Sequence, residues 1–383
     1  MRKRVLILGS TGSIGTSALT VARQIPERME IVGLAAGCRL EELEQQANEF
    51  GVIHLCLADE ARVAELKGDG RVVFAGATGL VELVEATRPD LVLVAIVGVE
   101  GLRPTLKAIE LGCDVAVASK EILVMAGEVV MNAAREKAVK ILPVDSEHNA
   151  IFQCLEGHRG GSEEVRRLIV TASGGPFRTW PREKLSEVTL EDALKHPTWE
   201  MGRKITVDSA TLFNKGLEMI EARWLFDIPM SKVDVVVHPQ SIVHSMVEFV
   251  DGSVLAQLST TDMCFPIQYA VVWPERLKNE LEPLDFPRLA RLEFEAPRTE
   301  DFPALLLARE AGEVGGTLPA VLNGANEVAN AAFCQRELSF PGIWKVVEET
   351  MNKVPHQASQ ELEVVVAADL EARRVAKDLT KRG

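Results

Sequence analysis

Short apolar segments alternate with helical patterns over the first 144 residues, and this alternation restricts the fold more than any other property of the chain. Leu91–Val97 is apolar throughout, as expected for a strand that helices cover on both faces. Strand-helix-strand repetition at this spacing predicts a doubly wound parallel sheet. The expected strands are Val5–Leu8, Ile31–Ala35, His54–Leu57, Arg71–Phe74, Leu91–Val97, Asp114–Ala118 and Lys140–Val144.

The pattern changes after about Asp145, where we expect an α+β region. Asp251-Gly252 between two strand-like runs, Ser241–Val250 and Ser253–Leu258, predicts a β-hairpin. A proline-rich stretch then indicates an extended linker, and helical patterns beyond it predict a C-terminal bundle. The expected parts are a first domain at 1–145, a second at 146–280, a linker at 281–303 and a helical domain at 304–383. The expected C-terminal helices are Ala304–Ala311, Pro319–Phe333, Gly342–Val354 and Leu362–Leu379.

Composition argues against several function classes. Among 383 residues, 56 acidic and 42 basic side chains give a net charge of −14, which disfavours a nucleic-acid-binding surface because such a surface needs clustered bases. The longest strongly apolar run, Leu91–Val99, is too short to span a bilayer. The six cysteines lack C-x-x-C spacing and are expected to be free thiols. We therefore expect a cytoplasmic protein without nucleic-acid or membrane partners.

A glycine-rich loop, Gly9-Ser-Thr-Gly12-Ser-Ile-Gly15, follows the first strand and opens a helix. Glycines there let the backbone approach a pyrophosphate, which predicts a dinucleotide site, although a tight turn without a ligand is the alternative. The second strand ends at Gly37-Cys38-Arg39, with no acid before Glu41. Because an acid at this point selects NAD and a cation selects NADP, the sequence favours NADP, with Arg39 as the partner of its 2′-phosphate.

Two carboxylates, Asp145 and Glu147, follow the seventh strand. In an extended segment they point the same way, and oxygen-only ligands favour Mg or Mn. An exposed acidic loop is the alternative. A third acid, Glu218, lies on a helix expected from about Ser209 to Trp224.

Several polar groups could bind an anionic substrate. Asn214 and Lys215 precede Glu218 by four and three residues, so all three share one helix face, which suits a polyol phosphate beside a metal. Ser173-Gly174-Gly175 offers hydroxyl and backbone donors. The segment 196–204, with His196 and Trp199, suits a closing lid, and Lys120-Glu121 ends the sixth strand. Each has a plainer alternative in packing, solvated charge or a salt bridge.

Together these segments resemble the 1-deoxy-D-xylulose 5-phosphate reductoisomerase family over nearly the whole chain. The resemblance implies a Rossmann-like NADPH domain, a catalytic domain, a C-terminal helical domain and a homodimer. The family usually has A-N-K-E where this chain has Ser119, which is shorter than asparagine and lacks its amide. The matching motifs are GSTGSIG (9–15), ASKE (118–121), PVDSEH (143–148), SGGPF (173–177), HPTWEMGRKITVDSATLFNKGLE (196–218), HPQSIVHSMVEFVDGS (238–253) and LNGANEVA (322–329).

The resemblance also assigns residues to roles. Those implied to bind NADPH are Thr11, Gly12, Ser13, Ile14, Gly37, Arg39, Ser119, Glu121 and Gly202. Those implied to bind Mg or Mn are Asp145, Glu147 and Glu218. Those implied to contact the substrate are Lys120, Ser146, Glu147, Ser173, His196, Trp199, Ser209, Asn214, Lys215 and Glu218.

The implied reaction is metal-dependent rearrangement of 1-deoxy-D-xylulose 5-phosphate and its reduction by NADPH to 2-C-methyl-D-erythritol 4-phosphate, a step of non-mevalonate isoprenoid biosynthesis. Glu147 is the candidate for moving hydroxyl protons and Lys120 for stabilising oxyanion charge. One alternative is a metal-independent NADP dehydrogenase of another aldehyde or sugar phosphate, which a chelator would not inhibit. Another is an NADP-sensing module without turnover.

Overall fold

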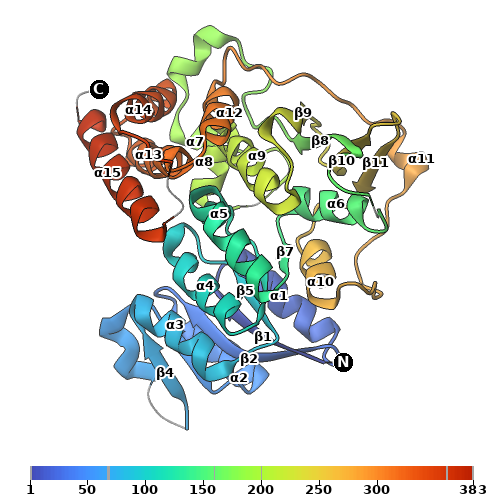
Figure 1. Ribbon diagram of the computed structural model, residues 1–383, viewed down its shortest axis with the longest axis vertical. Coiled ribbons are helices and arrows are strands. Elements are labelled where there is room, and N and C mark those ends of the chain that lie inside the picture. The colour runs from blue at the N-terminus through green and yellow to red at the C-terminus, as the bar shows by residue number, and fades with distance from the viewer. Residues whose placement is uncertain (1, 67–69, 159, 200, 359–360, 382–383) are drawn as a thin grey trace. The chain divides into compact units, whose positions relative to one another are not determined.

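The computed structural model describes residues 2–66, 70–158, 160–199, 201–358 and 361–381. The chain forms two compact units (Figure 1). The first comprises Met1–Ile122, Val130–Asn149 and Asp262–Glu282, and the second comprises Leu123–Val129, Ala150–Thr261 and Pro283–Gly383.

The first unit contains a seven-stranded parallel sheet, as the alternating pattern predicted. The order reverses between β1 and β5, and in sheets of this kind ligands bind at such a point, beyond the carboxyl ends of the strands. In spatial order the strands are β4 (Val72–Ala75), β3 (His54–Leu57), β2 (Met29–Ala36), β1 (Lys3–Leu8), β5 (Leu91–Val94), β6 (Asp114–Val117) and β7 (Ile141–Pro143).

Helices flank this sheet and bury its apolar strands (Figure 1). All four residues of β5 are fully buried, which explains why that segment is apolar throughout. The helical elements that begin in this unit are α1 (Ser13–Gln24), α2 (Leu40–Phe50), η1 (Glu60–Leu66), α3 (Gly76–Thr87), η2 (Val99–Gly101), α4 (Leu102–Glu110), α5 (Lys120–Lys137), α6 (Ser146–Leu155) and α10 (Cys264–Val272).

The second unit contains a four-stranded mixed sheet in the order β11-β10-β8-β9. The predicted hairpin is confirmed, with β10 (Val243–Phe249) antiparallel to β11 (Val254–Leu258). β8 (Val165–Ala172) pairs antiparallel with β10 and parallel with β9 (Val233–Val237). The strand β11 therefore forms one edge of the sheet.

Helices make up the rest of the second unit. The four C-terminal helices occur as predicted, and α13 packs against both α14 and α15. Within the expected linker lies one short helix, α11 (Phe286–Leu289). The remaining elements are η3 (Arg182–Glu187), α7 (Leu190–Ala193), α8 (Arg203–Thr211), α9 (Phe213–Phe226), η4 (Met230–Lys232), α12 (Ala304–Val314), α13 (Leu318–Cys334), α14 (Phe340–Lys353) and α15 (Leu362–Thr380).

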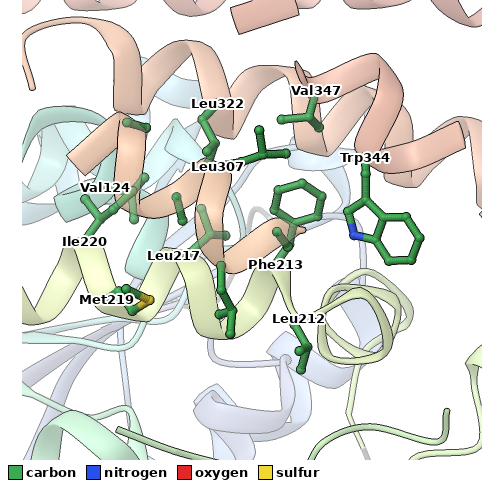
Figure 2. Close-up of a cluster of buried hydrophobic side chains, with 14 of the residues drawn as sticks. Val124, Leu212, Phe213, Leu217, Met219, Ile220, Leu307, Leu322, Trp344 and Val347 are labelled. Atoms are coloured by element: carbon green, nitrogen blue, oxygen red, sulfur yellow. The ribbon is translucent and has the colours of Figure 1, made fainter. Parts of the chain in front are cut away.

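One apolar core joins α9 to the C-terminal helices (Figure 2). Phe213 and Leu217 of α9 are fully buried among side chains of α12, α13 and α14, including Leu307, Leu322 and Trp344. The C-terminal helices therefore belong to the same compact unit as the second sheet, although the expected domain boundaries stay predictions.

Two further expectations concern cysteines and membrane spans. All six cysteines are free, as predicted, and Cys38 is exposed. In the part of the chain that the structure describes, no helix has the length and apolar character of a membrane span.

Candidate active site

The glycine loop after β1 is tightly packed against the neighbouring backbone. Gly9 has a φ of +96°, and a Cβ there would lie 2.5 Å from the carbonyl oxygen of Ala95, which follows β5. A Cβ on Gly15 would lie 2.3 Å from the carbonyl oxygen of Gly9. Because side chains cannot fit at these positions, the tight turn requires glycine, and it leads into α1 at the exposed residue Ser13. The loop lies at the point where the strand order reverses, and it contains Thr11, Gly12, Ser13 and Ile14.

At the end of β2, Gly37, Cys38 and Arg39 form an exposed turn before α2. The Arg39 guanidinium lies 3.2 Å from a carboxylate oxygen of Glu42. The predicted cation is thus at the expected strand end, although it is paired with an acid of its own helix.

The strands β6 and β7 end at the predicted polar residues of the first unit. Ser119 immediately precedes α5, and its hydroxyl donates to the carbonyl of Ile96. The ammonium of Lys120 is buried and lies 2.5 Å from Asp145 Oδ2. Glu121 is buried in the first turn of α5. This pairing holds a buried cation beside the acidic residues that follow β7.

The expected extended conformation of Asp145–Glu147 is wrong, because Ser146 already begins α6. Asp145 precedes the helix and Glu147 lies in its first turn, where the positive end of the helix dipole favours carboxylates. The two side chains nevertheless converge, with carboxylate oxygens within 4.8 Å of each other. Ser146 Oγ donates to Glu147 Oε2 at 2.6 Å.

In the second unit, His196 connects two predicted serines. Its Nε2 lies 3.0 Å from Ser173 Oγ and 3.1 Å from Ser209 Oγ. Its Nδ1 accepts backbone N–H groups from Thr198 at 3.2 Å and Trp199 at 3.0 Å, so the ring proton is on Nε2. The turn at Gly174–Gly175, in which both glycines have a positive φ, completes this group. The backbone N–H of Gly175 donates to Ser173 Oγ.

The single helix expected from Ser209 to Trp224 is wrong. Leu212 has a φ of +65° and separates α8, which ends after Ser209, from α9, which carries Asn214. Leu212 is buried in the core, so packing compensates for this unfavourable backbone conformation. Because of this break, Ser209, which contacts His196, lies on a different helix from Asn214.

The predicted face of α9 is confirmed. Asn214 Nδ2 donates to Glu218 Oε1 at 2.6 Å, and the Lys215 ammonium donates to Glu218 Oε2. Glu218 is fully buried and Lys215 nearly so. A buried carboxylate with both oxygens bound by an amide and an ammonium is satisfied rather than isolated.

The expected lid, 196–204, is described except for Glu200, which lies outside the described residues. The Trp199 ring lies near that of His244, with centroids 6.4 Å apart. Gly202 is exposed and precedes α8.

Models of the 1-deoxy-D-xylulose 5-phosphate reductoisomerase family match the chain at residues 5–127, and models of its C-terminal domains match at 141–226 and 258–375. The chain is 51% identical over 381 residues to the Chlorobaculum tepidum enzyme of that name, covering 98% of this chain and 99% of the relative. The chain belongs to this reductoisomerase family.

Further relatives of this reductoisomerase agree over the full length. The Symbiobacterium thermophilum enzyme is 51% identical over 386 residues, covering 99% of each chain. The solved Zymomonas mobilis reductoisomerase, in complex with NADPH, superposes with a TM-score of 0.92 at 44% identity and covers 100% of both chains. A DOX-P reductoisomerase structure with NADPH, fosmidomycin and magnesium gives a TM-score of 0.92 at 38% identity, covering 99% and 98%.

Sequence reasoning missed one polar cluster of this reductoisomerase. Asp208, which precedes Ser209 on α8, is buried and accepts from Asn326 Nδ2 at 2.9 Å and Asn330 Nδ2 at 2.8 Å. Its other oxygen lies 3.1 Å from the Lys204 ammonium. The available signal was the recurrence of asparagines along the apolar pattern of α13, a polar stripe that begins in the motif LNGANEVA and continues to Asn330.

Proposed function

We propose that this reductoisomerase converts 1-deoxy-D-xylulose 5-phosphate into 2-C-methyl-D-erythritol 4-phosphate with NADPH and a divalent cation, Mg or Mn. The observation that supports this most is the group formed by Ser173, His196 and Ser209. It presents neutral donors beside a glycine turn, as a phosphate site requires. It occurs in a chain whose family models cover most of its length.

The glycine loop fits NADPH because Gly9 and Gly15 form a tight turn with no room for a Cβ, and the turn opens α1 at the exposed residue Ser13. When bound, NADPH supplies the hydride. We assign its binding to Thr11, Gly12, Ser13, Ile14, Gly37, Arg39, Ser119, Glu121 and Gly202. The Ser119 hydroxyl already donates to the carbonyl of Ile96, so its part is to hold the β5 and β6 loops together beside the cofactor.

A divalent cation fits the carboxylates at the end of β7. Asp145 and Glu147 place oxygens within 4.8 Å of each other, and hard oxygen ligands suit Mg or Mn. Glu218 of the second unit is the third proposed ligand. When bound, the metal acts as a Lewis acid on the substrate's carbonyl oxygen. Fully buried Glu218 accepts hydrogen bonds from Lys215 and Asn214, which favour the carboxylate form that a metal ligand needs.

The chain's own groups have distinct roles in this proposal. Glu147, with Ser146 beside it, moves hydroxyl protons, and Lys120 places positive charge where oxyanion charge develops. The phosphate is bound remotely, so its binding energy closes the lid carrying Trp199 and excludes water before chemistry. The residues proposed to bind the substrate are Lys120, Ser146, Glu147, Ser173, His196, Trp199, Ser209, Asn214, Lys215 and Glu218.

The test is NADPH oxidation in the presence of deoxyxylulose phosphate, with and without Mg or Mn. We expect turnover that requires both the substrate and the metal, and complete loss with a chelator. Turnover of another sugar phosphate that survives chelation would instead identify a metal-independent dehydrogenase. NADPH binding without any turnover would identify a sensing module.

Two variants test the assigned roles. Glu147→Gln is expected to lose turnover with metal saturating, and near-normal turnover would remove Glu147 from proton transfer. Lys215→Ala is expected to weaken substrate binding. Lys353→Ala is the matched control, because Lys353 also pairs with a glutamate on its own helix, Glu349 at 2.9 Å, but is half exposed. An unchanged substrate KM in Lys215→Ala would refute the pocket assignment.

The proposal includes a homodimer. The edge strand β11 exposes about half of Val254 and of Leu255, and an exposed apolar edge is suited to pairing with a second copy. Light scattering should give twice the chain mass, and Leu255→Lys should shift the protein toward monomer. A cytoplasmic location stays a prediction.

A further inference from the structure

The turn at Gly37–Arg39, which is proposed to bind the 2′-phosphate of NADPH, is hydrogen-bonded by an arginine from another segment of the chain. Arg62 lies on η1, and its Nη1 donates to the carbonyl oxygen of Cys38 at 3.2 Å. Its Nη2 donates to Glu41 Oε1 at 2.6 Å. One guanidinium therefore contacts both the turn after β2 and the first acid that follows it.

The position of Glu41 gives this contact a consequence for cofactor choice. An acid at the end of the second strand binds the ribose hydroxyls of NAD and repels the 2′-phosphate of NADP. Glu41 is three-quarters exposed in the first turn of α2, and its contact with Arg62 brings its charge to the turn. Hydrogen bonding to Arg62 lowers the pKa of Glu41, so the carboxylate is fully ionised at neutral pH.

Arg39 alone does not neutralise the negative charge of the acids around the turn. It pairs with Glu42, the next residue of α2, so each of these neighbouring acids has one arginine partner. Removing Arg62 would leave Arg39 facing both Glu41 and Glu42. A phosphate monoester carries a charge of about −1.5 to −2 at neutral pH and would then meet net negative charge.

We propose that Arg62 determines the preference for NADPH over NADH by neutralising Glu41 and fixing the Gly37–Arg39 turn. The inference rests on the proposed NADPH function. Arg62 acts on Glu41 and the Cys38 carbonyl rather than on reacting atoms, so it is a specificity-determining residue. Its guanidinium also pairs with Glu65 of η1 at 3.2 Å, which orients it toward the turn.

The experiment measures dissociation constants of NADPH and NADH from nicotinamide fluorescence, without substrate. Arg62→Ala should raise the dissociation constant of NADPH about tenfold, which is the effect of one uncompensated charge ~5 Å from a phosphate in a water-like dielectric. The dissociation constant of NADH, which lacks the 2′-phosphate, should change by less than about twofold. Equal weakening of both cofactors would show that Arg62 only supports the fold, and an unchanged ratio would also overturn the inference.

A second substitution separates charge neutralisation from direct contact with the phosphate. Adding Glu41→Gln to Arg62→Ala should restore NADPH binding to within about threefold of the starting protein, because the acid that Arg62 neutralises at the turn is then uncharged and only Glu65 of η1 has lost this partner. Failure of this restoration would overturn the mechanism. Arg62→Lys keeps the charge, so it should retain the preference even where the alanine variant folds poorly.

The matched control is Arg23→Ala. Arg23 also pairs with a glutamate of α2, Glu49, at 2.5 Å. Glu49 lies eight residues beyond Glu41, about 12 Å along the helix, which exceeds the Debye length of about 8 Å at physiological salt. Arg23→Ala should leave the cofactor ratio unchanged. Absence of NADPH binding by the unmodified protein would overturn the proposed function itself, whereas an unaltered ratio in Arg62→Ala overturns only this inference.

Discussion

The buried carboxylate of Asp208 predicts a large stability cost for substitutions on α13. Asn330 Nδ2 donates to Asp208 Oδ1 at 2.8 Å and to the carbonyl oxygen of Lys204 at 3.0 Å, and both Asn330 and Asp208 are almost fully buried. A hydrogen bond to a charged group contributes about 1.5–3 kcal/mol, and one to a neutral carbonyl about 0.5–1.5 kcal/mol. Asn330→Ala should therefore lower the free energy of unfolding by about 3 kcal/mol.

Urea unfolding followed by tryptophan fluorescence measures this change, since Trp344 lies in the same core. Asp208→Ala and the double variant complete a double-mutant cycle. We expect a coupling energy of about 1.5–3 kcal/mol between Asp208 and Asn330, the contribution of one hydrogen bond to a charged group, since Asp208 keeps Asn326 and Lys204 as partners when Asn330 is removed. Asn352→Ala, at an exposed position of α14, is the control and should change stability by less than about 0.5 kcal/mol.

The same cluster should affect the phosphate site. Asp208 precedes Ser209, whose hydroxyl contacts His196, so loosening α8 should raise the KM for substrate. NADPH affinity should change less than the KM for substrate, because the glycine loop lies in the other compact unit and, of the residues assigned to NADPH, only Gly202 adjoins α8. A stability change below about 0.5 kcal/mol in Asn330→Ala, or a coupling energy near zero, would refute the assignment of Asn330 as a partner of the buried carboxylate.

Three other outcomes are expected. Gly15→Ala should abolish NADPH binding and lower the free energy of unfolding by about 1–3 kcal/mol, because the new Cβ would overlap the Gly9 carbonyl. Calorimetry with cofactor titration measures both effects. At about pH 8, iodoacetamide should label exposed Cys38 before Cys264, whose pKa burial raises to about 12, and peptide mass spectrometry would reveal the opposite order. Arg28 lowers the pKa of Glu275 by hydrogen bonding, so this pair stabilises the fold fully above the unfolded pKa of about 4.3 and loses its effect as pH falls through the lower pKa of the folded state. Glu275→Gln should therefore lower stability near neutral pH and have no effect in acid, and an equal effect at both pH values would contradict the ion pair.

Patterns that depend on nearby residues could be predicted from the sequence. The parallel sheet, the glycine loop, the hairpin at Asp251-Gly252 and the shared face of Asn214, Lys215 and Glu218 all follow from periodicity or from short spacings. In each of these, the residues that interact are neighbours in sequence or repeat at the period of one element.

The errors and omissions involve tertiary packing. Leu212 interrupts the expected helix without a glycine or proline at the break, because its buried side chain determines its left-handed conformation. Asp208 and its partners Asn326 and Asn330 are separated by 118 and 122 residues, so no local pattern connects them. Likewise, Arg62 belongs to none of the motifs described above, and its proposed role depends on η1 packing beside the turn after β2.

Charge shows the same dependence on tertiary structure. A net charge of −14 gives no indication that phosphates could bind. At three candidate positions, however, an acid is paired with a basic side chain: Glu218 with Lys215, Asp145 with Lys120 and Glu41 with Arg62. Since Coulomb interactions between exposed groups are screened within about 8 Å at physiological salt, these local pairs determine the potential that a ligand meets more than the distant excess of acids does. Anion binding by an acidic protein therefore depends on which acids are neutralised next to the site.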